Sequence, residues 1–265
     1  MNRLALHFSV AVACAASLQA QALQYPVKPI RIVVGFSPGG PTDVVARLVG
    51  QKLTEKWGQQ VIVDAKPGAG GNIAAEYVAK SPADGYTLLL PAFAHAVNPS
   101  LFSKLPFDTL RDFAPIALLS SAANVLAVHP SVQARNMSEL IALAKAKPKQ
   151  LTYGSAGNGT ASHLAGELLN MTAGIEVTHV PYKGSAPASS ELIGGHISAA
   201  FPGVAIALPH SKAGRMRSLA ITSPKRSQQM PELPTMSESG LKGFEVISWY
   251  ACLRLPERLR RSCRN

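Results

Sequence analysis

The feature that most constrains the fold is a strand, a glycine-rich loop and a helix, found in this order three times. Residues 30–36 form an apolar, β-branched run typical of a buried strand, residues 37–41 form a turn, and residues 42–57 have the apolar period of a helix. The same order follows with a loop at 67–71 and again with a loop at 154–159. Such alternation predicts parallel α/β sheets.

The rest of the chain continues this alternation and predicts two α/β domains. We expect the first domain to comprise residues 25–122 and 223–250, and the second to comprise residues 123–222. In the helix expected at residues 42–57, the apolar positions are expected to form the buried stripe. A further helix is expected to extend to Lys145, with Ser138 as its cap. The other expected strands are 61–63, 86–90, 116–119, 124–129, 151–153, 176–180, 197–201 and 219–221, and the other helices are 72–80, 160–171 and 188–193.

The three glycine loops, residues 37–42, 67–72 and 155–160, have the composition of an anion site. Glycine lets successive N–H groups point inward, and a helix start adds unpaired donors with a partial positive charge. Such loops meet at the carboxyl edge of an open α/β sheet, where ligands bind. With the hydroxyls of Ser155 and Thr160 and the amides of Asn72 and Asn158, converging loops suit a small ligand with one or two carboxylates. The alternative is that glycine serves only tight strand-to-helix turns.

Patterns typical of enzymes, metals and cofactors are missing. The loop at 37–43 is neither a dinucleotide fingerprint nor a P-loop, and Tyr153 stands where a nucleophile elbow needs its first glycine. No histidines or cysteines have ligand spacing, so neither a metal nor a cofactor is expected. His163, one turn into the helix after the third loop, favours a packing or capping role over that of a general base.

The charge of the chain is concentrated at its end. The formal net charge is +11, and the segment 254–265 has five arginines against one glutamate, a net charge of +4. The remaining basic residues are dispersed among acidic ones, without the interleaved aromatics that single strands require. We therefore expect no nucleic-acid partner.

The start of the chain predicts export. Arg3 precedes an apolar, alanine-rich run over residues 4–18, and Ala20-Gln21-Ala22 has the small-x-small pattern of a cleavage site. Residues 1–22 are therefore interpreted as a signal peptide, and the mature protein as periplasmic. The alternative is a lipoprotein anchored through Cys14.

Several motifs in order resemble the substrate-binding proteins of tripartite tricarboxylate transporters, the Bug family. The resemblance runs from about residue 25 to residue 250, and the motifs that carry it are Phe36-x-Pro38-Gly39-Gly40-x-x-Asp43, Pro67-Gly68-Ala69-Gly70-Gly71-Asn72, Asp84-Gly85-Tyr86-Thr87-Leu88, Tyr153-Gly154-Ser155-Ala156-Gly157-Asn158-Gly159-Thr160, His179-Val180-Pro181-Tyr182-Lys183-Gly184 and Leu208-Pro209-His210.

The resemblance implies a non-enzymatic, two-domain periplasmic binding protein of the type II, Venus-flytrap class, with a ligand cleft between its domains. It implies a monomer that captures a small carboxylate for a membrane permease; a sensor with the same site and an α/β enzyme acting on a carboxylate are the alternatives. In this family the loops 38–43 and 155–160 grip one carboxylate, partly through water, and neighbouring loops select the rest of the ligand. The ligand-binding residues expected here are Pro38, Gly39, Gly40, Thr42, Asp43, Asn72, Ala92, Ser155, Ala156, Gly157, Asn158, Gly159, Thr160, His163, Tyr182 and Pro202.

Two positions depart from the family pattern. Pro202 stands where the family usually has an aspartate that faces the cleft, so we expect simple carboxylic acids rather than amino acids as ligands. Residues 251–265 do not continue the family sequence, although reading from the third base of the Ala251 codon permits V-P-A-P-A-G-T-P-A-P-I-V-P-K. We therefore expect residues 251–265 to be an aberrant basic tail created by a frameshift, with the first domain incomplete; the alternative is a divergent amphipathic tail.

Overall fold

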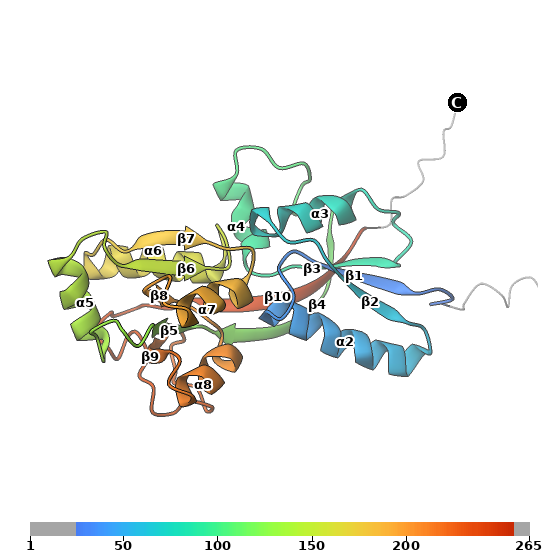
Figure 1. The fold of residues 1–265 in the computed structure, drawn as a ribbon. Helices are drawn as coiled ribbons and strands as arrows, with labels where there is room; N and C mark the ends of the chain where they lie inside the picture. The colour runs from blue at the N-terminus through green and yellow to red at the C-terminus, as the bar shows by residue number, and fades with distance from the viewer. Residues whose placement is uncertain (1–24, 257–265) are drawn as a thin grey trace, which may run out of the picture.

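A computed structural model describes residues 25–256 and shows two α/β lobes joined side by side (Figure 1). Each lobe is built on a five-stranded sheet, with the strand orders β2-β1-β3-β10-β4 and β7-β6-β8-β5-β9. The expected signal peptide, its alternative anchor at Cys14, and residues 257–265 of the expected tail lie outside the described residues.

The first sheet is mixed, which differs from the parallel sheet predicted. Strand β1 (Ile30–Val34) pairs in parallel with β2 (Val61–Ala65) and with β3 (Thr87–Leu90). Strand β10 (Ile247–Arg254) returns from the far end of the chain and lies antiparallel between β3 and β4 (Ala114–Ala123). Ala251 to Arg254, expected in the aberrant tail, therefore belong to this strand.

Helices cover both faces of the first sheet because the side chains of β1 alternate. Ile30, Ile32 and Val34 pack toward helix α2 (Pro41–Trp57), and Val33 packs toward α3 (Asn72–Ala79). A short 3-10 helix, η1 (Ala69–Gly71), leads into α3, and α4 (Ala94–Leu101) follows β3. The helices α3 and α4 lie on the opposite side of the sheet from α2 (Figure 1).

The buried face of α2 matches the predicted stripe only in part, since Val45 packs against the core cluster but other apolar positions do not. Leu48 and Val44 are 60% and 48% exposed, whereas Ala46 and Gly50 are buried. A Cβ atom on Gly50 would lie 3.2 Å from Cγ1 of Val61. The small side chains thus face the sheet because they allow the helix to approach it closely, and size outweighs hydrophobicity here.

The second sheet is mixed as well. Strand β6 (Thr152–Ser155) pairs in parallel with β7 (Thr178–Pro181) and β8 (Ala199–Ala200). Strand β5 (Val125–Val128) pairs antiparallel with β8 and with β9 (Arg217–Ile221).

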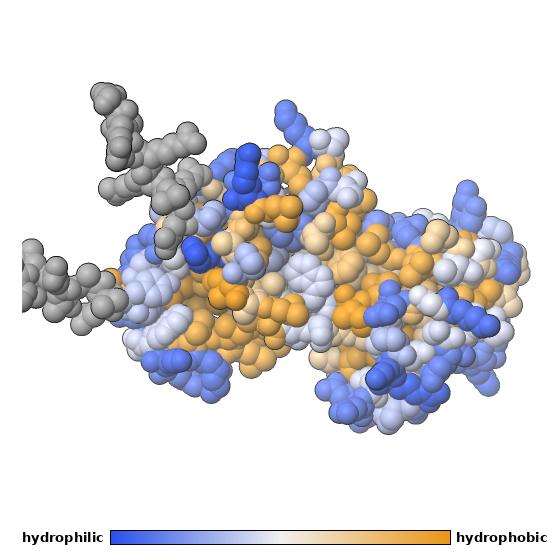
Figure 2. All heavy atoms as spheres, turned by 180° about the vertical axis from the view of Figure 1, so that it is seen from behind, coloured by the Kyte–Doolittle hydropathy of each residue, from blue (hydrophilic) through white to orange (hydrophobic). Residues whose placement is uncertain are grey.

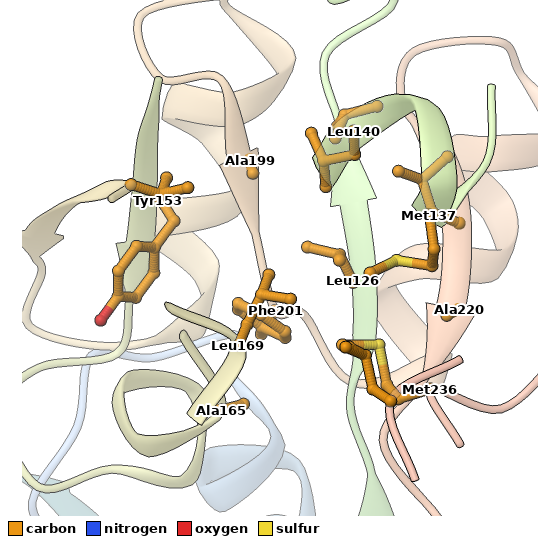
Figure 3. Close-up of a cluster of buried hydrophobic side chains, with 14 of the residues drawn as sticks. Leu126, Met137, Leu140, Tyr153, Ala165, Leu169, Ala199, Phe201, Ala220 and Met236 are labelled. Carbon is orange, nitrogen blue, oxygen red and sulfur yellow. The ribbon is translucent and has the colours of Figure 1, made fainter. Parts of the chain in front are cut away.

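Alternation along β5 divides the core of the second lobe. Leu126 and Val128 pack with helices α5 (Met137–Ala146) and α6 (Ala161–Ala173), together with Tyr153 and Phe201 (Figure 3). The other face carries α7 (Ser185–Ile193) and α8 (Val204–Lys212). The cap of α5 is Asn136, whose side chain accepts from the N–H of Glu139, so the expected cap at Ser138 is wrong by two residues.

Residues after β9 pack against the second lobe. Met236, Leu241, Phe244 and Val246 belong to the same buried cluster as Leu126, although residues 223–250 were expected in the first domain. The chain re-enters the first sheet only with β10 at Ile247. This packing favours a later return to the first lobe than predicted, and the domain bounds themselves stay a prediction.

Apolar surface remains on the first lobe. Strand β4 lies at the edge of its sheet, and its side chains Ile116 and Leu118 are 53% and 67% exposed. On the face drawn in Figure 2, apolar side chains gather toward the middle and polar ones toward the two ends. Among residues 25–256, no helix combines the length and apolar composition needed to cross a bilayer.

Candidate functional site

A cavity of about 270 Å³ lies between the two lobes. Both connections between the sheets pass along it, since Ala122, Ala123 and Asn124 line it at one crossing and Ser248 and Tyr250 at the other. The other lining residues are Phe36, Gly40, Pro41, Thr42, Ala92, Phe93, Ala94, Ala156, Thr160, Ala161, Ser162, Ser185, Gly203, Val204, Ala205 and Gln229.

Five helices of the described residues begin at this cavity. The starts of α2, α4, α6, α7 and α8 contribute Thr42, Ala94, Ala161, Ser185 and Val204 respectively. The first N–H groups of a helix have no partner within it, and the helix dipole places partial positive charge there. The caps of α2, α7 and α8 are glycines without a capping side chain. The five helix starts therefore direct partial positive charge toward one cavity, which favours an anion.

The attraction for an anion comes without charged side chains. No lysine, arginine, histidine, aspartate or glutamate is among the described residues that line the cavity. One helix start contributes about 0.3 to 1 kcal/mol toward an anion, whereas micromolar affinity requires about 8 kcal/mol. Micromolar binding of an anion would therefore require several helix starts and hydrogen bonds to act on one ligand. At about 30 Å³ per water molecule, the volume suits a small organic acid.

The polar side chains at the crossing are held rigidly. The Nδ2 of Asn124 donates to the carbonyl of Phe201 at 2.7 Å, and its Oδ1 accepts from Oγ of Ser248 at 2.8 Å. The N–H of Asn124 donates to Oγ1 of Thr222 at 2.9 Å. All three polar residues are buried. This network therefore joins the segment between β4 and β5, which contains Asn124, to β10, which contains Ser248.

The first glycine loop is closed by Asp43. Its Oδ2 accepts from the N–H of Gly39 at 3.1 Å and from Nε of Arg47 at 2.9 Å. Burial by itself would raise the pKa of Asp43, but the hydrogen bonds from Arg47 and Gly39 outweigh it and hold the pKa below its ordinary value. Asp43 does not line the cavity, so its carboxylate shapes the loop instead of facing the ligand.

The third glycine loop is supported from behind by two histidines. His179 Nε2 lies 2.6 Å from Oγ of Ser155, and Nδ1 of His163 accepts from the N–H of Gly159 at 3.1 Å. Ser155 also accepts from the N–H of Gly157 at 3.0 Å. Ala156 and Thr160 of this loop line the cavity, whereas Ser155 and both histidines do not.

Ser155 and His179 have the spacing of a nucleophile and its base, but not the surroundings. Ser155 is 1% exposed and lies on neither cavity that borders the loop. The geometry therefore gives this pair no access to a substrate.

The described residues also contain no group of three or more histidine, cysteine, aspartate or glutamate residues able to hold a metal ion.

A second cavity, of about 250 Å³, adjoins the first at shared lining residues. Ala156 and Phe36 line both cavities, and Gly157, Asn158 and Tyr182 line the second one. The second and third glycine loops meet beside it, because a Cβ atom on Gly70 would lie 2.7 Å from the carbonyl oxygen of Asn158.

The second loop is fixed by a buried amide pair. Nδ2 of Asn98 donates to the carbonyl of Gly70 at 3.1 Å and to Oδ1 of Asn72 at 2.6 Å. Asn72 thus holds the loop to α4 and does not reach the first cavity.

The structure brings the expected ligand residues together only in part. Gly40, Thr42, Ala92, Ala156 and Thr160 line the first cavity, and Ala156, Gly157, Asn158 and Tyr182 line the second. The rest lie beside or behind these loops, and their part in binding stays a prediction: Pro38, Gly39, Asp43, Asn72, Ser155, Gly159, His163 and Pro202.

Sequence reasoning missed the contribution of α8 to the cavity. Gly203, Val204 and Ala205 line it, and the carbonyl of the neighbouring Pro202 accepts from the N–H of Val125 at 2.8 Å. A signal was present, since Pro202-Gly203 precedes an apolar run in the same way as the other glycine turns precede helices.

Comparison with known proteins finds relatives over most of the chain. A UPF0065 protein from the tcbD-tcbE intergenic region of Pseudomonas sp. (strain P51) is 40% identical over 88% of this chain and 70% of its own length. Protein BugT of Bordetella pertussis is 38% identical over 86% of this chain and 71% of its own length. The chain thus spans about 70% of the length of these curated relatives.

Solved structures agree with the fold. The R. palustris protein Rpa4515, solved with adipate, is 36% identical and superposes with a TM-score of 0.86 over 88% of this chain and 79% of its own. The periplasmic binding protein BugD is 34% identical with a TM-score of 0.84, over 88% and 78% of the two chains. MatC of Rhodopseudomonas palustris with bound malate is 31% identical with a TM-score of 0.82, over 87% and 79%. The two-lobed fold is therefore that of periplasmic binding proteins.

Residues 45–258 match the family described as the tripartite tricarboxylate transporter family receptor, TctC. With this match and the relatives above, the chain belongs to the TctC receptor family, which includes the Bug proteins.

Proposed function

We propose that this protein is a periplasmic receptor that binds a small mono- or dicarboxylic acid between its two lobes. The observation that carries the proposal is the convergence of five helix starts on one cavity that no charged side chain of the described residues lines. Relatives of the same fold were solved with adipate and with malate, which supports a carboxylate as the ligand class.

We propose that the receptor delivers its ligand to the membrane subunits of a tripartite tricarboxylate-type transporter. Membership of the transporter receptor family supports this partnership. It also supports export to the periplasm and a binding role without catalysis.

Simple carboxylic acids fit the cavity better than amino acids do. An ammonium group in a cavity requires a carboxylate or several carbonyl acceptors, and no aspartate or glutamate of the described residues lines this one. Pro202 occupies the position where the family pattern has an aspartate, and its carbonyl is already paired with Val125. We therefore propose that succinate binds better than aspartate.

A thermal-shift screen tests the ligand class. Mono-, di- and tricarboxylates, aromatic acids and amino acids are added separately to the purified protein, since a ligand that binds the folded state raises its stability. We expect the largest shifts with mono- and dicarboxylates. A shift with aspartate equal to or larger than that with succinate contradicts the proposed selectivity, and no shift with any carboxylate contradicts the proposed function.

We also propose a division into a first domain of residues 25–122 with 247–256 and a second of residues 123–246. Packing of Met236, Phe244 and Val246 in the second-lobe cluster supports it. Amide exchange that protects residues 235–246 together with β5, rather than with β1, is the expected result.

A further inference from the structure

We propose that His163 is a positioning residue for the ligand, holding the third glycine loop in place through its unprotonated Nδ1. The inference rests on the proposed function, because it assigns a role to residues 155–160 as part of the carboxylate site. It concerns a side chain that touches neither cavity and acts through the loop.

The contact resembles a capping box. Thr160 is the N-cap of α6, and its Oγ1 accepts from the N–H of His163 at 3.4 Å. In a capping box a glutamate or glutamine at this third helical position reaches back to the N–H of the N-cap residue. Here the imidazole reaches one residue further, and its Nδ1 accepts from the N–H of Gly159 at 3.1 Å.

The loop has little room to rearrange around this contact. Gly159 has φ of +79°, and a Cβ atom there would lie 2.8 Å from Oδ1 of Asn98. Thr160 next to it lines the cavity, and its Oγ1 donates to the carbonyl of Gly157 at 2.6 Å. Fixing the N–H of Gly159 therefore fixes Thr160 and the start of α6, which border the cavity.

A second histidine supports the same loop. The ring of His179 lies 4.3 Å from that of His163, and its Nε2 contacts Oγ of Ser155. The ring of Tyr153 also stacks on His179, at 4.9 Å. The two imidazoles thus hold opposite ends of the loop, one through Ser155 and the other through Gly159.

The surroundings keep both imidazoles neutral. Burial lowers the pKa of His163, while the nearby Glu167 opposes this in part. Burial, followed by repulsion from His163, lowers the pKa of His179 to about 4, again against Glu167. Tyr153, the other titratable group facing the pair, donates its hydroxyl to Oε1 of Glu167 at 2.6 Å.

Protonation of His163 would place an N–H against the N–H of Gly159. Protonation should therefore weaken ligand binding. A purely electrostatic effect predicts the reverse, since a cationic imidazole near the cavity would strengthen the binding of an anion. The role proposed here requires a neutral ring with its lone pair on Nδ1, so its effect depends on acceptor geometry and not on positive charge.

Two variants separate acceptor geometry from titration. His163→Asn keeps an acceptor oxygen near the place of Nδ1 but cannot titrate, and His163→Leu has no acceptor. At pH 7.5 we expect the Asn variant to bind malate or adipate within about threefold of the wild type and the Leu variant to bind at least about tenfold more weakly. His196→Asn is the matched control, because His196 is exposed and its Nδ1 contacts Glu191.

A ligand-free measurement keeps the inference testable if a variant fails to fold or neither acid binds. In an NMR pH titration of the wild type, the amide of Gly159 should shift with a midpoint below about 6.5, the ordinary histidine value. The shift should follow the side-chain resonances of His163. A Gly159 amide that ignores this titration, or a folded Leu variant that binds as tightly as the wild type, overturns the inference. Failure of the wild type to bind any carboxylate counts against the proposed function instead.

Discussion

The N–H of Ser37 donates a hydrogen bond of 2.9 Å to the carbonyl oxygen of Lys183, and the hydroxyl of Ser37 donates to the same oxygen at 3.0 Å. Ser37 follows β1 in the first lobe, and Lys183 follows β7 in the second. Gly184 permits the approach, because a Cβ atom there would lie 3.1 Å from the nitrogen of Ser37. This contact joins the lobes beside the cavity, and it must break if the lobes separate to admit a ligand.

We expect the hydrogen bond from the hydroxyl of Ser37 to Lys183 to have a small effect on ligand affinity. Ser37→Ala removes one exposed hydrogen bond from the closed arrangement, which we expect to weaken carboxylate binding by about two- to fivefold, as measured by calorimetry. Ser223→Ala is a matched control, because Ser223 donates a similar bond to the carbonyl of Lys225 within one lobe. Equal affinities for the Ser37 variant and this control would contradict the role of the contact.

A negative charge at the start of α8 should abolish much of the attraction for an anion. Val204 lines the cavity and is the first residue of the helix, where an aspartate stabilises the helix itself. We expect Val204→Asp to fold normally and to bind a dicarboxylate at least about tenfold more weakly, through repulsion at short range. Val204→Asn, similar in size but neutral, should stay within about threefold of the wild type in the same titration.

The network at the crossing should matter for stability. Asn124→Ala removes the bonds to Phe201 and Ser248 and leaves buried partners unsatisfied, which we expect to cost about 2 to 4 kcal/mol. Ser248→Ala removes one of these bonds and should cost about 1 kcal/mol. Urea unfolding with an unchanged m-value gives both numbers, and equal losses for the two variants would refute the central place of Asn124.

His95 should make the fold sensitive to acid. It lies against Phe107 and Phe113, and burial lowers its pKa to about 4. The unfolded chain, with an ordinary pKa near 6.5, binds the proton more readily, so stability present above about pH 6.5 is lost as the pH falls toward 4.

The loss attributable to His95 amounts to about 3 kcal/mol. His95→Leu should reduce the difference in unfolding free energy between pH 7 and pH 4.5, measured by urea titration. His196→Leu, at an exposed position, is the control for the loss of an imidazole outside the core. An unchanged difference in the His95 variant would show that another group causes the acid sensitivity.

Sequence patterns predicted the part of the fold that local chemistry determines. The helix after the first glycine loop was expected at 42–57 and is found at Pro41–Trp57, because a proline starts it and Gly58, in the left-handed conformation, ends it. The three glycine loops were expected to converge. The first and third line one cavity through Gly40, Ala156 and Thr160, and the second lines the adjoining cavity through residues 68–70.

What the patterns missed depends on contacts between distant segments. Strand β10 lies between β3 and β4, and the local sequence of a strand does not show which distant strands it pairs with. Helices α4 and α8 contain Pro99 and Pro209, which disguise a helical pattern. Asn72, in the second glycine loop, and His163, in the helix after the third, were expected at the ligand. Their side chains bond to the loops and line neither cavity, and their part in binding stays a prediction.

The most direct test of the account is calorimetry with matched charged and uncharged ligands. Malate and adipate are titrated into the purified protein beside their diamides, which have nearly the same shape but no charge. If N–H donors at the helix starts recognise a carboxylate, at least one acid should bind one-to-one, and its diamide should bind at least about a hundredfold more weakly. An acid and its diamide of equal affinity, or a diamide that binds more tightly, would contradict the central claim.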